Sequence, residues 1–571
     1  MSLTLLALGF LVVLAAAYRL YGGWIARQFA LDDARATPAN EVNDGVDFVP
    51  TRPFYLFGQH FSAIAAAGPI AGPILACQAF GWLPCLLWIG FGVVLIGAVH
   101  DFTSLAASVR HGARSVADIA REHLGRRAGI AMMAFIWIAL VYVIVAFADI
   151  TAGTFVGGSE ELAGASGFNP GGAVAAASVM YLLLSILLGL VERFLKPPLW
   201  LSTVVFVPAA FALSWLGTKV STALLLDHKT WGVLILIYCC VASVVPVWAL
   251  LQPRGYLGGF ILYAALALGV YGVLAGGLSG EFTIQQPAFK SWDVGGLTGT
   301  LFPFLFVTIA CGACSGFHGL VCSGTTSKQI DRESHIKPVG YGAMLAEGFV
   351  ALIALVTIMI VAPAAIAKGT APGTIYGNGI GRFLTLIIGP EHLAFAVTFG
   401  AMAFSTFVFD TLDVCTRLGR YIVQELLGWR GRAGAVVGTL LTMALPFYFV
   451  VFAPPNSWSL FWTLFGASNQ LLAALTLLAI TVWLRQSRRR IGFTLYPMLF
   501  VLVITLWALV KLVIGNLAAV AVFDAGVVRD VKFINAIASA ALVALALYLA
   551  ATALLKLRRE RGPGALVPEG A

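Results

Sequence analysis

Charged residues are scarce in this chain of 571 residues. Asp, Glu, Lys and Arg together make up 11% of it, whereas 60% of the residues are hydrophobic. Soluble proteins carry roughly 25% charged residues, so the composition excludes an ordinary soluble domain. The apolar stretches are close to twenty residues long, which is the length of a helix that crosses a bilayer. The chain is therefore expected to be an all-α, polytopic membrane protein.

About fifteen crossings are expected from these stretches. They lie near 3–21, 60–80, 82–109, 129–156, 172–191, 199–216, 231–250, 256–277, 299–325, 338–365, 391–415, 435–453, 460–484, 493–515 and 534–556. The first stretch lacks the basic n-region of a signal peptide, so it is counted as a membrane helix. A Gly-rich segment, 373–389, is too interrupted to span and could be a lid helix over an outer vestibule.

The sequence also lacks the patterns that several other protein classes need. No large soluble domain is present, which argues against a sensor. Cys311 and Cys314 form a CxxC, but no second CxxC follows at zinc-ribbon spacing. The histidines are scattered rather than paired at bilayer depth, which argues against a haem protein. Buried thiols usually pack as small hydrophobes, so no cofactor, metal or catalytic residue is expected. A redox protein using Cys311 and Cys314 is the remote alternative.

Basic residues gather on one side of the expected membrane. When successive loops are assigned to alternate sides, one side receives 27 of the 35 Lys and Arg residues and the other receives seven, with Lys511 inside a crossing. Basic loops stay in the cytoplasm. The N-terminus is therefore expected outside and the C-terminus in the cytoplasm. This orientation accounts for the net charge of +9 without a nucleic-acid partner.

Helix-breaking residues interrupt two of the crossings. The stretch GPIAGP (68–73) places two Gly-Pro pairs in one crossing, and each proline removes a backbone donor and crowds the preceding turn. The stretch CGACSGFHGLVCSGTTS (311–327) brings glycines, hydroxyls and His318 into another. Breaks are expected near 68–73 and 312–319. Discontinuous helices that run in opposite directions, as these two would, are how many secondary transporters build substrate and ion sites.

A third stretch places ionisable groups on one helical face. Thr406, Asp410, Asp413 and Arg417 are three or four residues apart. Ionisable residues inside a membrane are costly and point to function. Asp410 is expected to couple Na⁺ or a proton, and Asp149 is a similar candidate. Asp413 and Arg417 are expected to be structural and could form an i,i+4 ion pair.

The candidate site residues come from these three stretches, together with Asp149. Those expected to bind substrate are Gly68, Pro69, Gly72, Pro73, Gly312, Ser315, Gly316, His318 and Ser323. Those expected to couple H⁺ or Na⁺ are Asp149, Thr325, Thr326, Thr406 and Asp410. His318 is the most proton-sensitive of them, because an unperturbed imidazole has a pKa of about 6.5.

Several motifs together resemble the carbon starvation protein A (CstA) family. They are GPIAGP (68–73), HDF (100–102), VWALLQPRGYL (247–257), CGACSGFHGLVCSGTTSKQ (311–329), TLDVCTRLGRY (411–421) and FGASNQLLAAL (465–475). The resemblance covers about 54–480. Gly255 departs from it, since many relatives are expected to carry an acidic residue there. Asn469 and Gln470, in the last motif, are expected to bridge helices through amide hydrogen bonds.

The resemblance implies a LeuT-like inverted-repeat core of discontinuous helices with peripheral helices around it, as in the amino acid–polyamine–cation superfamily. The partner of the GPIAGP helix in that repeat is open: either 299–325 or 231–250, broken at Val245-Pro246. The expected units are an N-terminal helix and loop (1–58), a transporter core (59–484) and C-terminal peripheral helices with a basic tail (485–571).

The resemblance also implies a bacterial inner-membrane secondary transporter induced on carbon starvation. Members of the family are described as peptide transporters or as proton-coupled pyruvate importers. Import of a small carboxylate such as pyruvate by proton or sodium symport is the expected function. Peptide uptake is the alternative, and the oligomeric state is left open.

Overall fold

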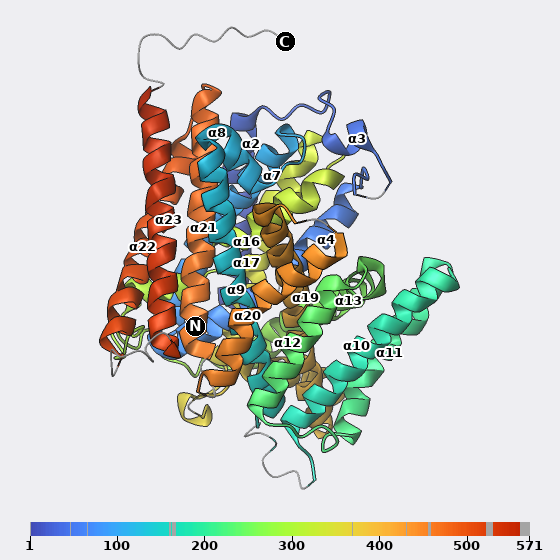
Figure 1. The fold of residues 1–571 in the computed structure, drawn as a ribbon. Helices are drawn as coiled ribbons and strands as arrows, with labels where there is room; N and C mark the ends of the chain where they lie inside the picture. The colour runs from blue at the N-terminus through green and yellow to red at the C-terminus, as the bar shows by residue number, and fades with distance from the viewer. Residues whose placement is uncertain are drawn as a thin grey trace.

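The computed structural model describes residues 2–559 except 46, 66, 159–161, 163–166, 368, 430, 455–457 and 521–528. The basic residues Lys368, Arg430 and Arg561, used in the orientation count, lie outside the described residues. The described chain is a bundle of helices (Figure 1). Strand pairing in these residues is limited to two isolated bridges, Thr51 with Ile330 and Asp293 with Thr300.

Among the described residues, twelve helices are long and apolar enough to cross a membrane, and a thirteenth is counted if one bent pair forms a single span. The unbroken ones are α9 (Arg126–Val156), α10 (Pro170–Phe194), α11 (Leu199–Lys219), α19 (Leu393–Leu427), α20 (Gly431–Phe452), α21 (Trp458–Gln486), α22 (Gly492–Ala518) and α23 (Val531–Arg559). Four are built from successive pieces: α1 (Leu3–Arg19) with α2 (Tyr21–Phe29), α6 (Trp82–Gly92) with α7 (Ala98–Arg110), α13 (Leu251–Tyr271) with α14 (Gly277–Ser279), and η7 (Lys337–Gly342) with α17 (Ala343–Met359). The bent pair is α4 (Pro53–Ile64) with α5 (Gly68–Phe80).

The expected number of about fifteen crossings is higher than this count. Two expected crossings account for the difference. One is α12 (His228–Val244), an apolar helix of only 17 residues. The other is split into α15 (Leu301–Thr308) and α16 (Gly316–Gly324), neither of which is long enough to span on its own. The glycine and polar residues of 311–327 lie at the split between α15 and α16, whereas α12 ends just before Pro246.

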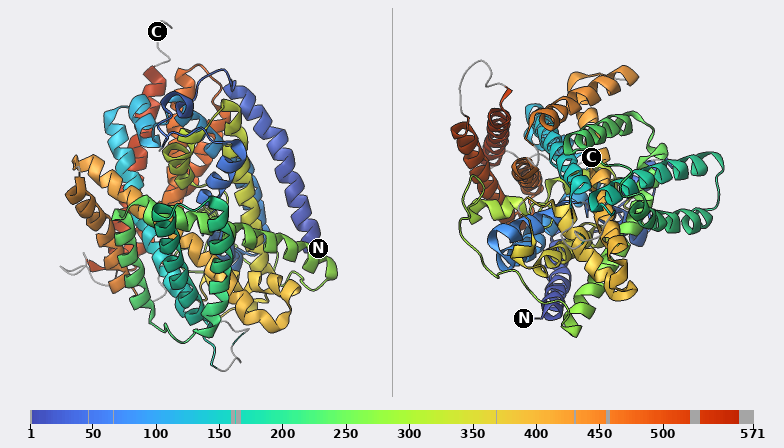
Figure 2. Two further views of the ribbon diagram at one scale, coloured as in Figure 1. Left: turned by 90° about the vertical axis from the view of Figure 1, so that its right-hand side faces the viewer. Right: turned by 90° about the horizontal axis from the view of Figure 1, so that it is seen from below.

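Burial separates central helices from peripheral ones. Every residue in the most apolar window of α21 is buried, against 22% for α11 and 28% for α23. In Figure 1, α9 and α21 run through the middle of the molecule. Figure 2 shows α10 and α11 projecting on one side and α22 and α23 lying on another. The C-terminal helices α22 and α23 lie at the edge, and α10 and α11 form a second pair at the edge.

Several of the loops that were assigned to the basic side lie together at one end of the molecule, where α2 and α8 are labelled at the top of Figure 1. There Glu333 accepts hydrogen bonds from Arg35 at 2.9 Å and from Arg110 at 2.9 and 3.0 Å. Arg489 donates to the carbonyl of Phe29 at 2.8 Å. Hydrogen bonds from Ser334 lower the pKa of the exposed Asp33 carboxyl below its usual value. Loops far apart in sequence are thus joined at this end, which we call the basic end.

The segment expected to be a lid forms a helix that is packed within the bundle. Residues Pro372–Ile388 form α18, and its first half is buried against α17 and α19. Its glycines permit this close approach. A Cβ at Gly377 would lie 2.7 Å from the Ala401 Cβ and 2.9 Å from the Ala401 backbone nitrogen, and one at Gly379 would lie 2.3 Å from the Thr357 Cβ.

Replacing Gly377 by Ala should therefore destabilise the bundle. The added methyl group would collide with the α19 backbone, which cannot rotate away, and such overpacking costs about 1–3 kcal/mol. We expect a lower midpoint of thermal unfolding for the purified protein in detergent. Gly255→Ala is the matched control, because a Cβ there meets no atom within 4 Å. Equal midpoints for the two variants would contradict the packing described for α18.

Candidate functional site

The first helix break lies just before the Gly-Pro motif rather than within it. Helix α4 ends at Ile64, α5 begins at Gly68, and their axes are bent by 45°. Residues 68–73, where the break was expected, form the first turns of α5. The correction has a simple physical reason. Proline fits the first turn of a helix, where its missing N–H would have no partner, so Pro69 starts a helix instead of breaking one.

The second break also lies earlier than expected. Helix α15 ends at Thr308 and α16 begins at Gly316, so the chain is unwound over 309–315 and not over 312–319. Gly316 and His318 are in the first turn of α16. Gly312 and Ser315 lie in the unwound segment. A Cβ at Gly316 would lie 2.5 Å from the Ala473 nitrogen, so glycine lets α16 start directly against α21.

The two broken helices pack against each other at their breaks. Helix α5 contacts α15 and α4 contacts α16, so the two pairs run in opposite directions. A Cβ at Gly68 would lie 2.4 Å from the Cys311 Sγ, and one at Gly72 would lie 2.6 Å from the Thr308 carbonyl oxygen. The structure thus places 299–325, not 231–250, opposite the GPIAGP helix. Helix α12 ends at Val244 and is not continued beyond Pro246.

Side chains from neighbouring helices bind the backbone that the second break leaves free. Gln470 donates to the Phe306 carbonyl at 2.8 Å, Trp462 to that of Thr308 at 3.0 Å, and Trp88 to that of Ile309 at 3.1 Å. The Asn469 Oδ1 accepts from the Phe317 backbone N–H at 2.9 Å. Buried backbone groups need such partners, so these residues hold the unwound segment in one shape.

Asn469 also binds side chains of the unwound segment. Its Nδ2 donates to the Ser315 Oγ at 3.0 Å and to the Cys311 Sγ at 3.2 Å. The Asn469 amide therefore contacts Cys311, Ser315 and Phe317, in and just after the break. Cys311, half of the CxxC motif, is buried between this amide and Gly68. All eight cysteines are free thiols in the structure.

A buried group of histidines and carboxylates lies beside the break, and we call it the His–carboxylate cluster: His100, Asp101, His318 and Glu347. The His318 Nδ1 lies 2.8 Å from the Asp101 Oδ2, and its Nε2 lies 3.2 Å from the Glu347 Oε2. The other Asp101 oxygen lies 2.8 Å from the His100 Nδ1. The cluster joins α7, α16 and α17, because each helix contributes to it.

His60 of α4 extends this group toward the first broken helix. Its Nδ1 lies 2.9 Å from the Thr326 Oγ1, and its Nε2 lies 3.9 Å from the Cys322 Sγ. Thr326, an expected ion-coupling residue, is thus a partner of His60. The neighbouring hydroxyls of Ser323 and Thr325 bond to carbonyls one turn earlier in α16, those of Gly319 and Val321.

A second buried ionic group, the arginine cluster, is formed by Tyr238, Arg254, Asp410 and Asp413. Arg254 is fully buried and donates to the Asp410 Oδ1 through Nε at 2.9 Å and Nη2 at 2.7 Å. Its Nη1 lies 2.7 Å from the Asp413 Oδ2. The Tyr238 hydroxyl donates to the same oxygen at 2.8 Å. The Asp410 side chain is 24% exposed, so the cluster reaches open space on one side.

Arg417 does not pair with Asp413 as the spacing suggested. Its Nη2 donates to the carbonyls of Ala242 and Val245 at 2.7 and 2.8 Å. These carbonyls end α12, and a cation at a helix C-terminus is favoured. Arg254 takes the place at Asp413 because α13 brings it between the two carboxylates of α19. Thr406, one turn from Asp410, is buried, and its hydroxyl has no hydrogen-bond partner among the described residues.

Asp149 lies apart from both clusters. It is on α9, and its Oδ1 lies 3.4 Å from the Nε2 of His228 at the start of α12. The same nitrogen lies 3.2 Å from the Asp149 carbonyl oxygen. The residues expected to couple ions are therefore spread over three places: Thr326 beside His60, Asp410 in the arginine cluster, and Asp149 between α9 and α12.

Sequence reasoning selected His318 and Asp410 but missed their partners. Glu347 is a single carboxylate within the apolar stretch 343–359, and that isolation is a signal that could have identified it. Asp101 and Arg254 were noted only as parts of the HDF (100–102) and VWALLQPRGYL (247–257) motifs. Asp101 and Arg254 meet their partners through contacts between helices that are more than 150 residues apart in sequence.

Sequence comparison finds one matching family model and several similar proteins. The family model described as "Carbon starvation protein CstA" matches residues 1–378 and 360–508. A protein named "Peptide transporter CstA" from Campylobacter jejuni is 33% identical over 86% of this chain and 77% of its own. One of the same name from Bacillus subtilis is 33% identical over 88% and 89%. A "Pyruvate/proton symporter BtsT" from Escherichia coli is 31% identical over 86% and 79%.

Among solved structures, a manganese transporter from Eremococcus coleocola aligns over 90% of this chain and 97% of its own. The TM-score is 0.44 and the identity is 14%. This likeness is too weak to support a conclusion about the chain.

Asn469→Ala should destabilise the broken helix. The substitution leaves the Phe317 N–H buried without its partner, and such a group costs about 1–3 kcal/mol. We expect a clear fall in the midpoint of thermal unfolding of the detergent-purified protein. Asn516→Ala is the matched control: Asn516 is also buried, but within the described residues its amide bonds to the Leu512 carbonyl of its own helix. A fall no larger than the control's would show that Asn469 does not hold the break.

Proposed function

This chain belongs to the carbon starvation protein CstA family, and we propose that it is a secondary transporter of the bacterial inner membrane. It imports a small carboxylate such as pyruvate together with a proton. The N-terminus faces outward and the basic end faces the cytoplasm, as the distribution of Lys and Arg suggests. Relatives named as a peptide transporter and as a pyruvate/proton symporter support the transport class.

The observation that carries the proposal is the His–carboxylate cluster. When His318 is protonated and both Asp101 and Glu347 are ionised, the cluster has a net charge of −1 in a site that is closed to solvent. Buried net charge is costly, so uptake of one more proton would neutralise the cluster. Glu347 is the natural acceptor, because His318 is its ion-pair partner and, among the described residues, its oxygens have no other partner.

The substrate would bind where the two breaks meet. Helix α16 starts there, and the N-terminus of a helix attracts an anion through its free N–H groups and its dipole. Gly312, Ser315 and Gly316 line this start, and His318 follows within its first turn. A carboxylate held here would lie next to the His–carboxylate cluster. Proton uptake and anion binding would then favour each other, which is the coupling that symport requires.

A proton fits this arrangement better than a sodium ion. Hard cations such as Na⁺ need several oxygen ligands, and the obvious supply would be the carbonyls freed at the break. In the described residues, the carbonyls of Phe306, Thr308 and Ile309 already accept side-chain hydrogen bonds. In the arginine cluster, Arg254 already neutralises Asp410. We therefore assign coupling to the His–carboxylate cluster and a supporting role to Asp410 and Thr406.

Peptide uptake is the second candidate function. Several relatives are named as peptide transporters. A peptide needs an acidic group for its amino terminus, and Asp410 is the partly exposed carboxylate of the arginine cluster. A peptide would therefore have to reach Asp410 as well as the helix break.

Uptake of labelled pyruvate into proteoliposomes tests the proposal. With an inward proton gradient and no sodium, we expect pyruvate to accumulate above its external concentration and to leak out when a protonophore is added. The control is the same experiment with protein-free liposomes. If folded protein shows no pyruvate uptake but accumulates dipeptides, the carboxylate proposal is wrong and the peptide function stands. Accumulation only in the presence of Na⁺ would refute proton coupling.

Glu347→Gln should separate accumulation from exchange. The amide resembles a permanently protonated carboxyl group, so the cluster could no longer gain and lose its proton. We expect proton-driven accumulation to fall by about tenfold or more, which corresponds to about 1.4 kcal/mol of lost coupling. Exchange of labelled for unlabelled substrate across the membrane should persist.

Glu192→Gln is the matched control for this variant. Glu192 is on the peripheral helix α10 and accepts a hydrogen bond from Ser202. The same chemical change is thus made far from the cluster and should leave accumulation intact. Normal proton-driven substrate accumulation by Glu347→Gln would contradict the coupling role of the cluster.

A further inference from the structure

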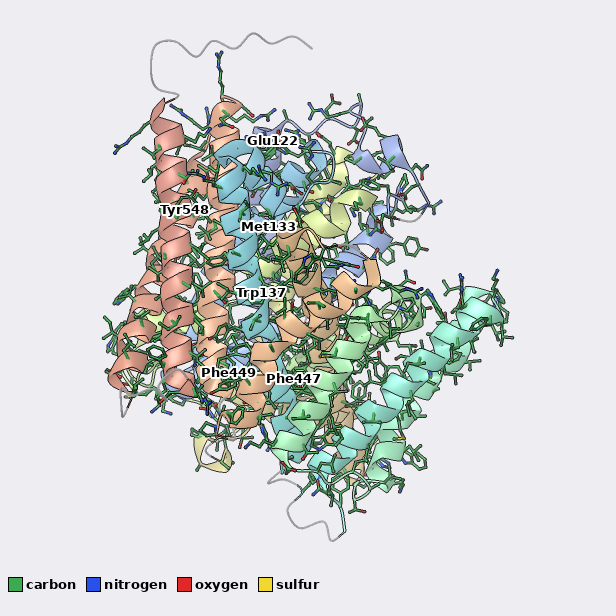
Figure 3. All side chains as sticks on the ribbon, viewed as in Figure 1. Glu122, Met133, Trp137, Phe447, Phe449 and Tyr548 are labelled. Carbon is green, nitrogen blue, oxygen red and sulfur yellow. The ribbon has the colours of Figure 1, made fainter. Side chains whose placement is uncertain are left out.

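A pair of histidines lies at the basic end, outside the transport site. His111 follows α7, and His123 is near the end of α8 (Val116–Leu124). Their Nε2 atoms are 2.8 Å apart. Glu122 is beside them, and one ligand atom from each of the three residues falls within 4.8 Å of the others. Figure 3 shows Glu122 at the upper end of the molecule, on α8.

The partners at the far side of each ring assign the tautomers, with the Gln486 amide oxygen facing His123. The His111 Nδ1 lies 2.6 Å from the Ala107 carbonyl oxygen, and the His123 Nδ1 lies 2.6 Å from the Gln486 Oε1. Both oxygens are acceptors, so both Nδ1 atoms carry hydrogen. A neutral imidazole carries one hydrogen, which leaves each Nε2 with a lone pair. The two lone pairs then face each other at hydrogen-bond distance, and this arrangement calls for a cation between them.

We propose that His111, His123 and Glu122 form a binding site for a divalent transition metal of the zinc class. Zinc accepts imidazole nitrogen at about 2.0–2.1 Å and carboxylate oxygen at about 2.0–2.2 Å, with water as a fourth ligand. The rings need to separate by only about 0.5 Å, because nitrogens around a tetrahedral ion are about 3.3 Å apart at those bond lengths. Glu122 is exposed and pairs with Arg114 at 2.9 Å, so it can turn to the metal by giving up a surface ion pair.

The surroundings match those of a metal site. Metal-bound histidines usually donate their second N–H to a carbonyl, carboxylate or water, which orients the ring. Ala107 and Gln486 provide this contact for both rings. Trp483 of α21 packs edge-on against His111 with ring centroids 5.0 Å apart. Both rings are partly exposed, so an ion can enter from solution. The His–carboxylate cluster, by contrast, is closed to solvent.

A bound metal would join three helices at the basic end. His111 follows α7, His123 and Glu122 belong to α8, and Gln486 ends α21. Helix α7 also carries Asp101, and α21 carries Asn469, which holds the break. The metal would therefore brace α8 against two helices of the transport site and stabilise their relative position.

Cobalt(II) absorption tests the site directly. The full-length protein is purified with a tag that contains no histidine and is freed of metal with a chelator. Addition of Co²⁺ should produce the visible absorption bands of a nitrogen-ligated ion, saturating at one ion per chain, and Zn²⁺ should displace them. His111→Ala and His123→Ala should each weaken binding by about tenfold or more, and Gln486→Ala, which loses the ring-orienting contact, by about 10- to 100-fold.

His392→Ala is the matched control, because His392 and Glu391 form another exposed His–Glu pair, with 3.7 Å between Nε2 and Oε1. It should bind Co²⁺ like the wild type. Zn²⁺ should also raise the thermal midpoint of the wild type and not that of His111→Ala. If the wild-type protein binds Co²⁺ no better than the double variant His111→Ala/His123→Ala, the proposal is wrong. The histidines would then share a proton, with the Gln486 amide turned around.

Discussion

The requirement that buried backbone groups find partners inside the protein governs the centre of this structure. Two helices are interrupted side by side, and the unwound residues 309–315 would otherwise lose their hydrogen bonds in a medium without water. The chain meets this requirement with side chains from other helices. Asn469 and Gln470 come from α21, whose most apolar window is wholly buried, and tryptophans come from α6 and α21.

Glycines also make the interruption possible, because they let the broken helices pack closely against each other and against α21. At Gly68 and Gly72, α5 approaches the second broken helix so closely that a Cβ would overlap with it. At Gly316 the start of α16 touches the α21 backbone in the same way. The break is therefore a rigid, tightly packed junction. A rigid junction suits the anion site proposed above, since little has to be ordered when an anion binds.

The buried charges follow a second rule, which is that they occur in groups with partners. The His–carboxylate cluster and the arginine cluster each contain two carboxylates. In the arginine cluster the cation is a guanidinium that cannot lose its proton, so Asp410 and Asp413 are permanently paired. In the His–carboxylate cluster the cation is an imidazole, and its charge can change. The two clusters thus differ in whether the cation can lose its proton, which is the property that proton coupling would require.

Much of this protein could be predicted from its sequence. The membrane class followed from the near absence of charge, and the positions of the crossings followed from the apolar runs, because each run must match the bilayer. The two breaks were found from Gly and Pro but displaced by a few residues, since proline begins a helix more readily than it interrupts one. His318 and Asp410 were selected because polar residues at bilayer depth are costly. These inferences depend only on local composition and on the bilayer.

Only the tertiary structure decided which groups meet. Glu347 and Asp101 join His318 from α17 and α7, and Arg254 joins Asp410 from α13. The tertiary structure also places the segment 299–325 opposite the GPIAGP helix and directs Arg417 toward α12. The sequence leaves these pairings open, because each arises from the packing of one helix against another. Periodicity along one helix shows which face is polar but not which helix lies against it.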